Sequence, residues 1–265
     1  MTAAGASGGG PAASKTAVIT GASSGIGEAL ARRLASEGRR LLLVARRADR
    51  LEALCDELGG GAIFEAADLT DPDAAARIAA RAEAEFDRLD LLVNNAGGNR
   101  KRGEFGDADY GYEYVREVMD QNFDSAVRVT EALLPFLRRS APSAIVNVGS
   151  IAGRIARPRA GAYNAAKFAL NGWTEGLYHE ERARGVHVGL VTPGFIATEG
   201  FPQKQFTDRA LTRWMVGRPE QAVDAIVKAA NGKPEVSVPG WYGLLPRLRY
   251  LAPGLVRYAL SGRRR

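Results

Sequence analysis

The sequence predicts an α/β fold: a single doubly wound, parallel sheet of about seven strands with helices on both faces. Short apolar segments alternate with longer helical patterns along most of the 265 residues. These short segments are apolar throughout and do not alternate with polar residues, as expected of strands that helices cover on both sides. We find no internal repeat and no second core-forming region, so we expect one domain over residues 15–240.

The expected strands and helices follow one another in chain order. TAVIT (16–20) is the first buried strand, followed by the helical pattern GEALARRLASEG (27–38). RLLLVA (40–45) leads into a helix around RLEALCDEL (50–58). The remaining strands are expected at 62–66, 89–95, 143–150, 186–194 and 235–239, and the remaining helices at 72–87, near 108–140 and at 161–184. Ligands of such a sheet bind beyond the carboxyl ends of its strands.

Composition excludes several classes of protein. Hydrophobic residues make up 46% and charged residues 25%, as in ordinary globular proteins. The one cysteine, Cys55, excludes an intrachain disulfide. Residues 1–14 are small and lack an apolar run, so we expect a disordered tail and no signal peptide. No stretch reaches the roughly 18 apolar residues of a spanning helix, and we expect a cytoplasmic protein.

The net charge of +6 belongs to the C-terminal end of the chain. From Trp241 onward there are six arginines and no acidic residue, which leaves 30 basic and 30 acidic residues in 1–240. A neutral body does not indicate a nucleic-acid-binding face. His179 and His187 have no catalytic-triad or metal-ligand partners in the sequence, so we expect no metal site.

Residues 241–265 form a basic amphipathic extension in this interpretation. At about 100° per residue, one helical arc gathers Leu244, Leu245, Leu248, Leu251, Leu255 and Val256. Pro253 and Gly254 interrupt the pattern, which predicts two short helices. The apolar arc can pack on the body or a partner subunit, or lie on an anionic membrane surface. We favour packing, because the prolines limit a continuous membrane-facing stripe.

The first two strand ends indicate a dinucleotide. TGASSGIG (20–27) opens directly into a helix, where glycines let backbone N–H groups approach a pyrophosphate. A plain turn is the alternative, because three residues separate the first two glycines. The second strand leads to Arg46 and Arg47, where NAD-selective folds carry an acidic residue. A guanidinium can bind a 2′-phosphate, so we expect NADP(H); solvated arginines are the alternative.

The later strand ends are also small or polar. Ser150 ends the fifth strand, and Tyr163 and Lys167, four positions apart, share one face of the next helix. A packed tyrosine and a solvated lysine would explain that spacing in isolation. The fourth strand ends in NNAGG (94–98) and the sixth in TPGFIAT (192–198).

Together these motifs resemble the short-chain dehydrogenase/reductase family, through TGASSGIG, NNAG, Ser150, YNAAK (163–167) and Pro193–Gly194. The resemblance covers roughly residues 15–240, in the family's order. It implies a Rossmann fold, an oxidoreductase that interconverts a carbonyl and a secondary alcohol, and a homodimer or homotetramer formed through the two long central helices.

The resemblance also implies the roles of individual residues. Tyr163 would be the general acid or base, Lys167 would favour its phenolate and hold the nicotinamide ribose, and Ser150 would polarise the substrate oxygen. Asn122, 28 residues before Ser150, would fix a water in the proton relay. The implied cofactor-binding residues are Gly21, Ser23, Ser24, Gly25, Ile26, Gly27, Arg46, Arg47, Asp68, Leu69, Asn95, Ala96, Gly97, Tyr163, Lys167, Pro193, Gly194, Ile196 and Thr198.

The substrate is less constrained. The segment after Gly194 contains Phe195, Ile196, Phe201, Phe206, Trp214 and Met215, which favours a lipophilic carbonyl or alcohol. The equally weighted alternative is that these residues pack a lid on the core. Arg154, Arg157 and Arg159 could meet an anionic substrate but are more often solvated on such a loop. A non-catalytic dinucleotide-binding regulator is the alternative function. A serine hydrolase is excluded because Ser150 lacks a G-x-S-x-G context and a partner histidine.

Overall fold

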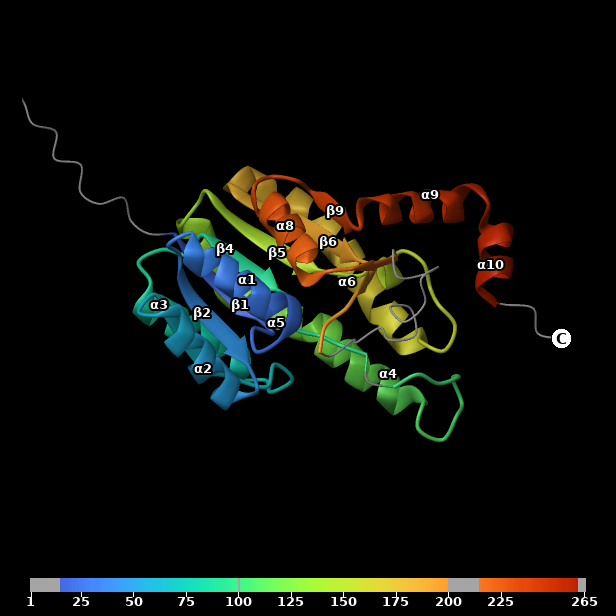
Figure 1. Cartoon of the computed structure of the whole chain (residues 1–265), viewed down its shortest axis with the longest axis horizontal. Coiled ribbons are helices and arrows are strands. Elements are labelled where there is room, and N and C mark those ends of the chain that lie inside the picture. The colour runs from blue at the N-terminus through green and yellow to red at the C-terminus, as the bar shows by residue number, and fades with distance from the viewer. Residues whose placement is uncertain (1–14, 100, 200–214, 262–265) are drawn as a thin grey trace, which may run out of the picture.

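The computed structural model describes residues 15–99, 101–199 and 215–261 of the chain. Seven parallel strands form its central sheet, in the order β3-β2-β1-β4-β5-β6-β9 (Figure 1). From β1 outward to β3, and from β4 to β6, strands and helices alternate along the chain and neighbouring strands are parallel, as in a doubly wound sheet. The predicted fold class is confirmed. The predicted disordered tail, residues 1–14, lies outside the described residues.

The apolar central strands are buried, and strand pairing ends where side chains form hydrogen bonds with the backbone. β4 ends at Asn94, and the N–H of Asn95 donates to Thr20 Oγ1 at 3.0 Å in place of a neighbouring strand. The expected strands 89–95 and 143–150 are therefore shorter in the structure. The strands are β1 (Thr16–Thr20), β2 (Arg40–Ala45), β3 (Ala62–Ala66), β4 (Leu91–Asn94), β5 (Ser143–Val148), β6 (Val186–Pro193) and β9 (Glu235–Val238).

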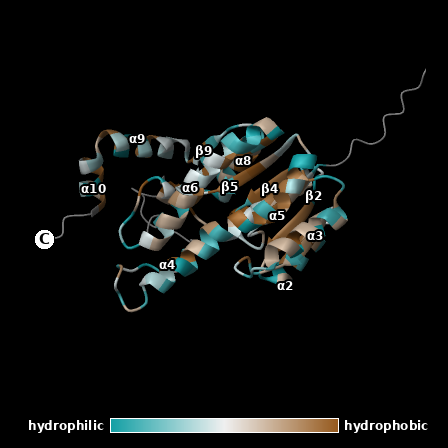
Figure 2. Ribbon diagram, turned by 180° about the vertical axis from the view of Figure 1, so that it is seen from behind, coloured by the Kyte–Doolittle hydropathy of each residue, from teal (hydrophilic) through white to brown (hydrophobic). Residues whose placement is uncertain are grey.

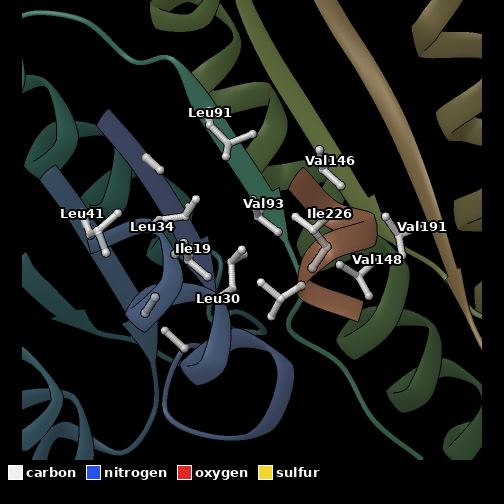
Figure 3. Close-up of a cluster of buried hydrophobic side chains, with 14 of the residues drawn as sticks. Ile19, Leu30, Leu34, Leu41, Leu91, Val93, Val146, Val148, Val191 and Ile226 are labelled. Atoms are coloured by element: carbon white, nitrogen blue, oxygen red, sulfur yellow. The ribbon is translucent and has the colours of Figure 1, made fainter. Parts of the chain in front are cut away.

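One face of the sheet is covered by α1 (Gly25–Ser36), α2 (Ala48–Leu58) and α8 (Pro219–Ala230). Figure 3 shows Leu30 and Leu34 of α1 and Ile226 of α8 lying over the side chains of β1, β4 and β5. The helix α8 is absent from the elements expected above. Its first turn begins with proline, a residue well suited to the first helical position.

The opposite face is covered by α3 (Ala74–Glu85), α5 (Ser125–Arg139) and α6 (Gly161–Glu181). Seen from this side, Figure 2 shows hydrophobic strands beneath helices whose outer surfaces are largely hydrophilic. Leu133 and Phe136 of α5 are fully buried among the side chains of this layer, together with Ile78 of α3. Burying such side chains stabilises the fold by about 1.5–3 kcal/mol each.

The long helix expected near 108–140 is interrupted. α4 (Tyr112–Met119) runs into one π-helical turn, η1 (Asp120–Asp124), before α5 begins. Such a turn inserts an extra residue into the helix and commonly marks a functional site. It carries Asn122, which is almost completely buried.

Two short parallel strands, β7 (Phe195–Ile196) and β8 (Val216–Gly217), pair beside the main sheet and were not expected. Single turns of 3₁₀ helix lie at η2 (Ile151–Gly153), η3 (Arg182–Arg184) and η5 (Gly240–Gly243). None of the helices in the described ranges is long and apolar enough to cross a membrane.

The chain ends in the two short helices that the sequence predicts, α9 (Leu244–Leu251) and α10 (Pro253–Ser261), which project from the body in Figure 1. The preferred expectation is that their leucines pack on the body or on a partner subunit. Packing on the body is wrong for Leu244, Leu248, Leu251 and Leu255, which are exposed. Packing on a partner subunit stays a prediction.

Candidate active site

The carboxyl ends of β1, β2, β4, β5 and β6 border one cleft with a volume of about 660 Å³. The structure brings most of the predicted site residues together along its walls: Gly21, Ser23, Ser24, Gly25, Ile26, Arg46, Arg47, Asp68, Leu69, Asn95, Ala96, Gly97, Ser150, Tyr163, Lys167, Pro193, Gly194, Ile196 and Thr198. Gly27 and Asn122 lie behind this lining and support it.

The turn after β1 is tight because neighbouring backbone touches it. Gly25 begins α1 with a φ of 61°, in the left-handed region that favours glycine. A Cβ on Gly27 would lie 2.3 Å from the carbonyl oxygen of Gly21, so a side chain there would push α1 away from the turn. Asn95 donates from Nδ2 to the carbonyl oxygen of Thr20 at 3.0 Å. These contacts hold the segments after β1 and β4 side by side with their backbones bordering the cleft.

The two arginines after β2 have different surroundings. Arg47 donates to the hydroxyl oxygen of Ser23 at 3.2 Å and to its carbonyl oxygen at 3.1 Å, and it pairs with Glu199 at 3.3 Å. Arg46 makes a longer ion pair, 3.8 Å to the carboxylate of Asp68, and about half of its side chain is exposed. Arg47 is therefore held on the glycine-rich turn, whereas Arg46 has room to turn toward an anion.

Ser150, Tyr163 and Lys167 meet beside the end of β5. The Oγ of Ser150 accepts a hydrogen bond from the N–H of Ala152 at 3.1 Å. The helix α6 carries Tyr163 and Lys167 on the face that borders the cleft, and both side chains are buried. Nζ of Lys167 donates to the carbonyl oxygen of Val148 at 3.0 Å and lies 5.9 Å from the centroid of the Tyr163 ring.

Burial controls the protonation of this pair. Removal from water lowers the pKa of Lys167 to about 8, because the interior disfavours the ammonium. Burial likewise raises the pKa of the Tyr163 phenol, against the opposing influence of a hydrogen bond with Ser150 and the charge of Arg157. At neutral pH the phenol therefore keeps its proton, and most of the lysine stays charged. Release of that proton depends on positive charge nearby.

Asn122 supports the wall of the cleft through hydrogen bonds of its side-chain amide. Its Oδ1 accepts from the N–H of Gly98 at 2.9 Å, and its Nδ2 donates to the carbonyl oxygens of Gly98 and Val118, each at 3.0 Å. The side-chain amide thus ties the π-helical turn to the segment that follows β4. A Cβ on Gly97 would lie 2.7 Å from Oδ1, so the fit around this amide is close.

The three arginines between Ser150 and Tyr163 separate in the structure. Arg154 pairs with Glu235 at 2.9 Å, and Arg159 is exposed with a φ of 58°. Arg157 lines the cleft, with its guanidinium carbon 5.3 Å from the centroid of the Phe195 ring. Partial burial lowers the pKa of Arg157. One of these arginines therefore borders the space beside Tyr163.

The segment after β6 closes the other side of the cleft. A Cβ on Gly25 would lie 3.1 Å from Cβ of Thr198, so Thr198 packs over the start of α1. Phe195 and Ile196 both border the cleft. The carbonyl oxygen of Met215 accepts from the Tyr242 hydroxyl at 3.2 Å. Phe201, Phe206 and Trp214, on which the prediction of a lipophilic substrate also rests, lie outside the described residues.

Several lining residues are missing from the sequence-based set: Ala45, Ala67, Thr70, Gly98, Glu117, Gln121, Val148, Gly149 and Ile151. Most adjoin a predicted residue, so widening each motif by one position would have included them. Gln121 adjoins Asn122, and Glu117 could have been found from Gln121, four positions later on the same face of a helix. Among the described residues, no group of three or more His, Cys, Asp or Glu side chains is placed to hold a metal ion.

Comparison with known proteins agrees with this arrangement. The short chain dehydrogenase family model matches residues 15–208. The chain is 34% identical to 11-beta-hydroxysteroid dehydrogenase 1A of Arabidopsis thaliana over 261 residues, covering 92% of this chain and 74% of that protein. It is 33% identical to the fatty acyl-CoA reductase of Acinetobacter baylyi over 256 residues, covering 93% and 83%. The crystal structure of a short-chain dehydrogenase from Streptomyces avermitilis superposes with a TM-score of 0.78 at 27% identity, covering 93% of this chain and 97% of that one.

Proposed function

The chain belongs to the short-chain dehydrogenase family of oxidoreductases, and we propose that it uses NADP(H) to interconvert a lipophilic carbonyl compound and its secondary alcohol. The observation that carries this proposal is the meeting of Ser150, Tyr163 and Lys167 at one end of a cleft whose other end is bordered by Arg46. Such a cleft can place a reacting carbon beside a proton donor while it holds a long cofactor.

The cleft fits a dinucleotide. The helix α1 begins at Gly25 without a side-chain cap, and Ser24, Gly25 and Ile26 line the cleft. The first backbone N–H groups of a helix have no partner within it and favour an anion such as a pyrophosphate. When bound, the nicotinamide supplies or accepts the hydride.

In this proposal the residues of the chain transfer the proton and stabilise the charges that form. Tyr163 donates its phenol proton to the substrate oxygen during reduction and takes it back during oxidation. The charge of Lys167 stabilises the phenolate that forms, since an opposite charge nearby favours the ionised group. Ser150 donates a hydrogen bond to the same oxygen. Burial of all three side chains strengthens these interactions, because little water screens them.

Asn122 acts by positioning in this proposal. Its amide is bonded to the backbone of Gly98 and Val118, so it keeps the cleft wall in place next to Lys167. The relay water that the family resemblance implies for Asn122 stays a prediction.

The cofactor preference and the substrate class rest on separate features. Arg46 presents an exposed guanidinium at the end of β2, which favours the 2′-phosphate of NADP(H). Phe195, Ile151 and Ile196 supply apolar surface near Tyr163, which favours a lipophilic substrate. Two similar proteins bear names that refer to a steroid and to a fatty acyl-CoA. The cytoplasmic location and the homo-oligomer stay predictions from the sequence.

The test is a substrate screen with both cofactors. Full-length protein is incubated with NADPH or NADH and a panel that pairs long-chain, steroid and aromatic carbonyls with short polar ones, and oxidation of the reduced nicotinamide is followed by absorbance. We expect turnover of the lipophilic members with NADPH, and its loss in Tyr163→Phe. NADPH binding without turnover of any member would instead favour the non-catalytic regulator.

A further inference from the structure

Large apolar side chains on the surface are concentrated in one place. We call residues 241–261, which comprise most of η5 together with α9 and α10, the C-terminal arm. Within the described ranges, nine large hydrophobic residues are exposed, and seven belong to the C-terminal arm: Leu244, Leu248, Tyr250, Leu251, Leu255, Tyr258 and Leu260. Leu251 is 84% exposed. Exposed apolar side chains gathered in one segment indicate a candidate site of interaction with another molecule.

The C-terminal arm is attached to the body along one side, which leaves its other sides open. Arg249 donates from Nη1 to the carbonyl oxygen of Arg154 at 2.9 Å, and its guanidinium carbon lies 5.3 Å from the centroid of the Phe168 ring. At the base of the C-terminal arm, Tyr242 is buried. Figure 1 shows α9 leading away from the sheet and α10 turning off from its end. The exposed leucines therefore belong to a segment that is attached to the body by specific contacts.

The open sides of the C-terminal arm also carry uncompensated positive charge. Arg247 and Arg257 are exposed, and in the described part of the chain neither pairs with a carboxylate. The sequence from Trp241 to its end has six arginines and no acidic residue. The leucines and the arginines therefore require a partner that is both apolar and anionic.

We propose that the C-terminal arm docks on an anionic lipid surface, with its leucines in the acyl boundary and its arginines against the phosphate headgroups. Short basic amphipathic helices bind in this way without spanning the bilayer. Nearby anionic headgroups add to the affinity for each arginine. This inference does not depend on the proposed function.

A second copy of the chain fits the same surface less well. A two-fold contact through the C-terminal arm would bring Arg247 and Arg257 of one chain close to those of the other, and residues 241–261 contain no acidic residue to offset them. Residues 1–240 contain equal numbers of basic and acidic residues, so their net charge provides no counterpart. The charge therefore favours the lipid surface over self-association.

The test is co-sedimentation of the full-length protein with vesicles of phosphatidylcholine alone or mixed with phosphatidylglycerol. We expect sedimentation with the mixed vesicles at low salt, and a reduction in affinity of at least tenfold at high salt because counterions screen the arginines. Failure to sediment with the mixed vesicles at low salt overturns the proposal.

Matched variants locate the contact. We expect the double variants Leu248→Ser with Leu251→Ser, and Arg247→Ser with Arg257→Ser, each to lose at least tenfold in affinity for the mixed vesicles. Phe105→Ser with Tyr112→Ser, which removes two exposed aromatic residues from the body, should bind like the unaltered chain. Equal binding by every variant overturns the proposal. Loss of a dimer in the leucine variant, with vesicle binding unchanged, assigns the surface to a second copy instead.

Discussion

The candidate active-site cleft and the C-terminal arm depart from the usual pattern of burial in opposite directions. The cleft buries a lysine, Lys167, and an amide, Asn122, whereas the C-terminal arm exposes leucines such as Leu248 and Leu251. A charged group normally stays in water and a leucine normally leaves it. The protein folds despite both departures, and we interpret the two regions as candidate sites of contact with another molecule.

The two regions also differ in how they are supported. Two buried side chains near the cleft donate hydrogen bonds: Asn94 to Thr130 Oγ1 and Asn147 Oδ1, both at 2.8 Å, and Lys167 to the carbonyl oxygen of Val148. The sheet and its helices supply these partners. Among the described residues, Oδ1 of Asn94 and Nε of Arg157 have no hydrogen-bond partner. The leucines of the C-terminal arm receive no comparable cover from the described residues. The described residues therefore supply polar partners to side chains at the cleft, whereas they leave the leucines of the C-terminal arm exposed.

The largest effect is expected from Tyr163→Phe, which tests whether the buried residues of the cleft carry out the proposed reaction. The substitution removes the transferable proton and little else, so turnover should fall by about 10²–10⁴-fold while NADPH binding is nearly intact. Single-turnover kinetics and fluorescence titration with NADPH measure the two quantities. A variant that retains more than about a tenth of the rate of the chemical step would show that Tyr163 is not the acid.

Arg46→Ala tests the far end of the cleft. Loss of a charge-assisted hydrogen bond costs about 1.5–3 kcal/mol, which corresponds to a Kd for NADPH weakened by about ten- to a hundredfold. The Kd for NADH should hardly change. Arg50→Ala is the matched control, because Arg50 pairs with Glu199 but does not line the cleft. Equal losses for both cofactors in Arg46→Ala would indicate a folding defect.

Lys167→Met should separate stability from function. The pKa of Lys167 is lowered from 10.5 to about 8, so at pH 7 the fold holds a charge that it disfavours. Removing the buried charge is favourable, and losing the hydrogen bond that Lys167 makes is unfavourable. The net effect should stabilise the cofactor-free protein by about 2 kcal/mol. Turnover should be largely lost, because the phenolate of Tyr163 would have no nearby ammonium. Thermal melts at pH 7 and enzymatic assays measure both changes.

The pH dependence gives an independent check on Lys167. Between pH 8 and 10.5 the unfolded lysine keeps its proton while the folded one releases it, so the stability of the unaltered protein rises relative to the variant. The advantage of Lys167→Met should shrink across this range and reverse above it, because the penalty of the buried charge is then absent and the hydrogen bond to Val148 is still lost. An advantage that is constant with pH would mean that packing, and not charge, explains the difference.

The smallest effect is expected in the C-terminal arm. Because Leu248 and Leu251 are exposed, replacing both with serine should change the free energy of unfolding by no more than about 0.5 kcal/mol per site. Leu42→Ala, a truncation in the buried core, should cost about 2–5 kcal/mol. Chemical denaturation compares the two at low protein concentration without lipid. A large decrease in the free energy of unfolding of the serine variant would show that Leu248 and Leu251 contribute to folding stability, contrary to this comparison.

The cleft could be predicted from the sequence because its residues sit at strand ends, and strand ends are local features. Gly25, Ser150 and Tyr163 each follow from a short motif whose place in a parallel sheet is settled by strand order. The helix α8 also carries a local signal, with Ala222, Val223 and Ile226 at helical spacing, which the sequence-based assignment did not use.

Other features depend on distant contacts and could not be predicted. Arg154, Arg157 and Arg159 look alike in the sequence; pairing with Glu235 and backbone conformation separate them. The leucine periodicity of the C-terminal arm defines an apolar side, but whether the body offers a matching face is a property of the whole fold. Asn122 was found through a family resemblance. Its hydrogen bonds to Gly98 depend on a π-helical turn that the helical pattern near 108–140 does not predict.

The hydrogen bond from Arg249 to the carbonyl oxygen of Arg154 connects the two regions directly. Arg154 lies in the loop between Ser150 and Tyr163, so we expect a displacement of α9 to affect the segment that borders the cleft. Any factor by which occupancy of the C-terminal arm changes the affinity of a ligand for the cleft is the factor by which that ligand changes the affinity of the C-terminal arm. Lipid binding measured with and without a saturating cleft ligand would give this coupling free energy directly.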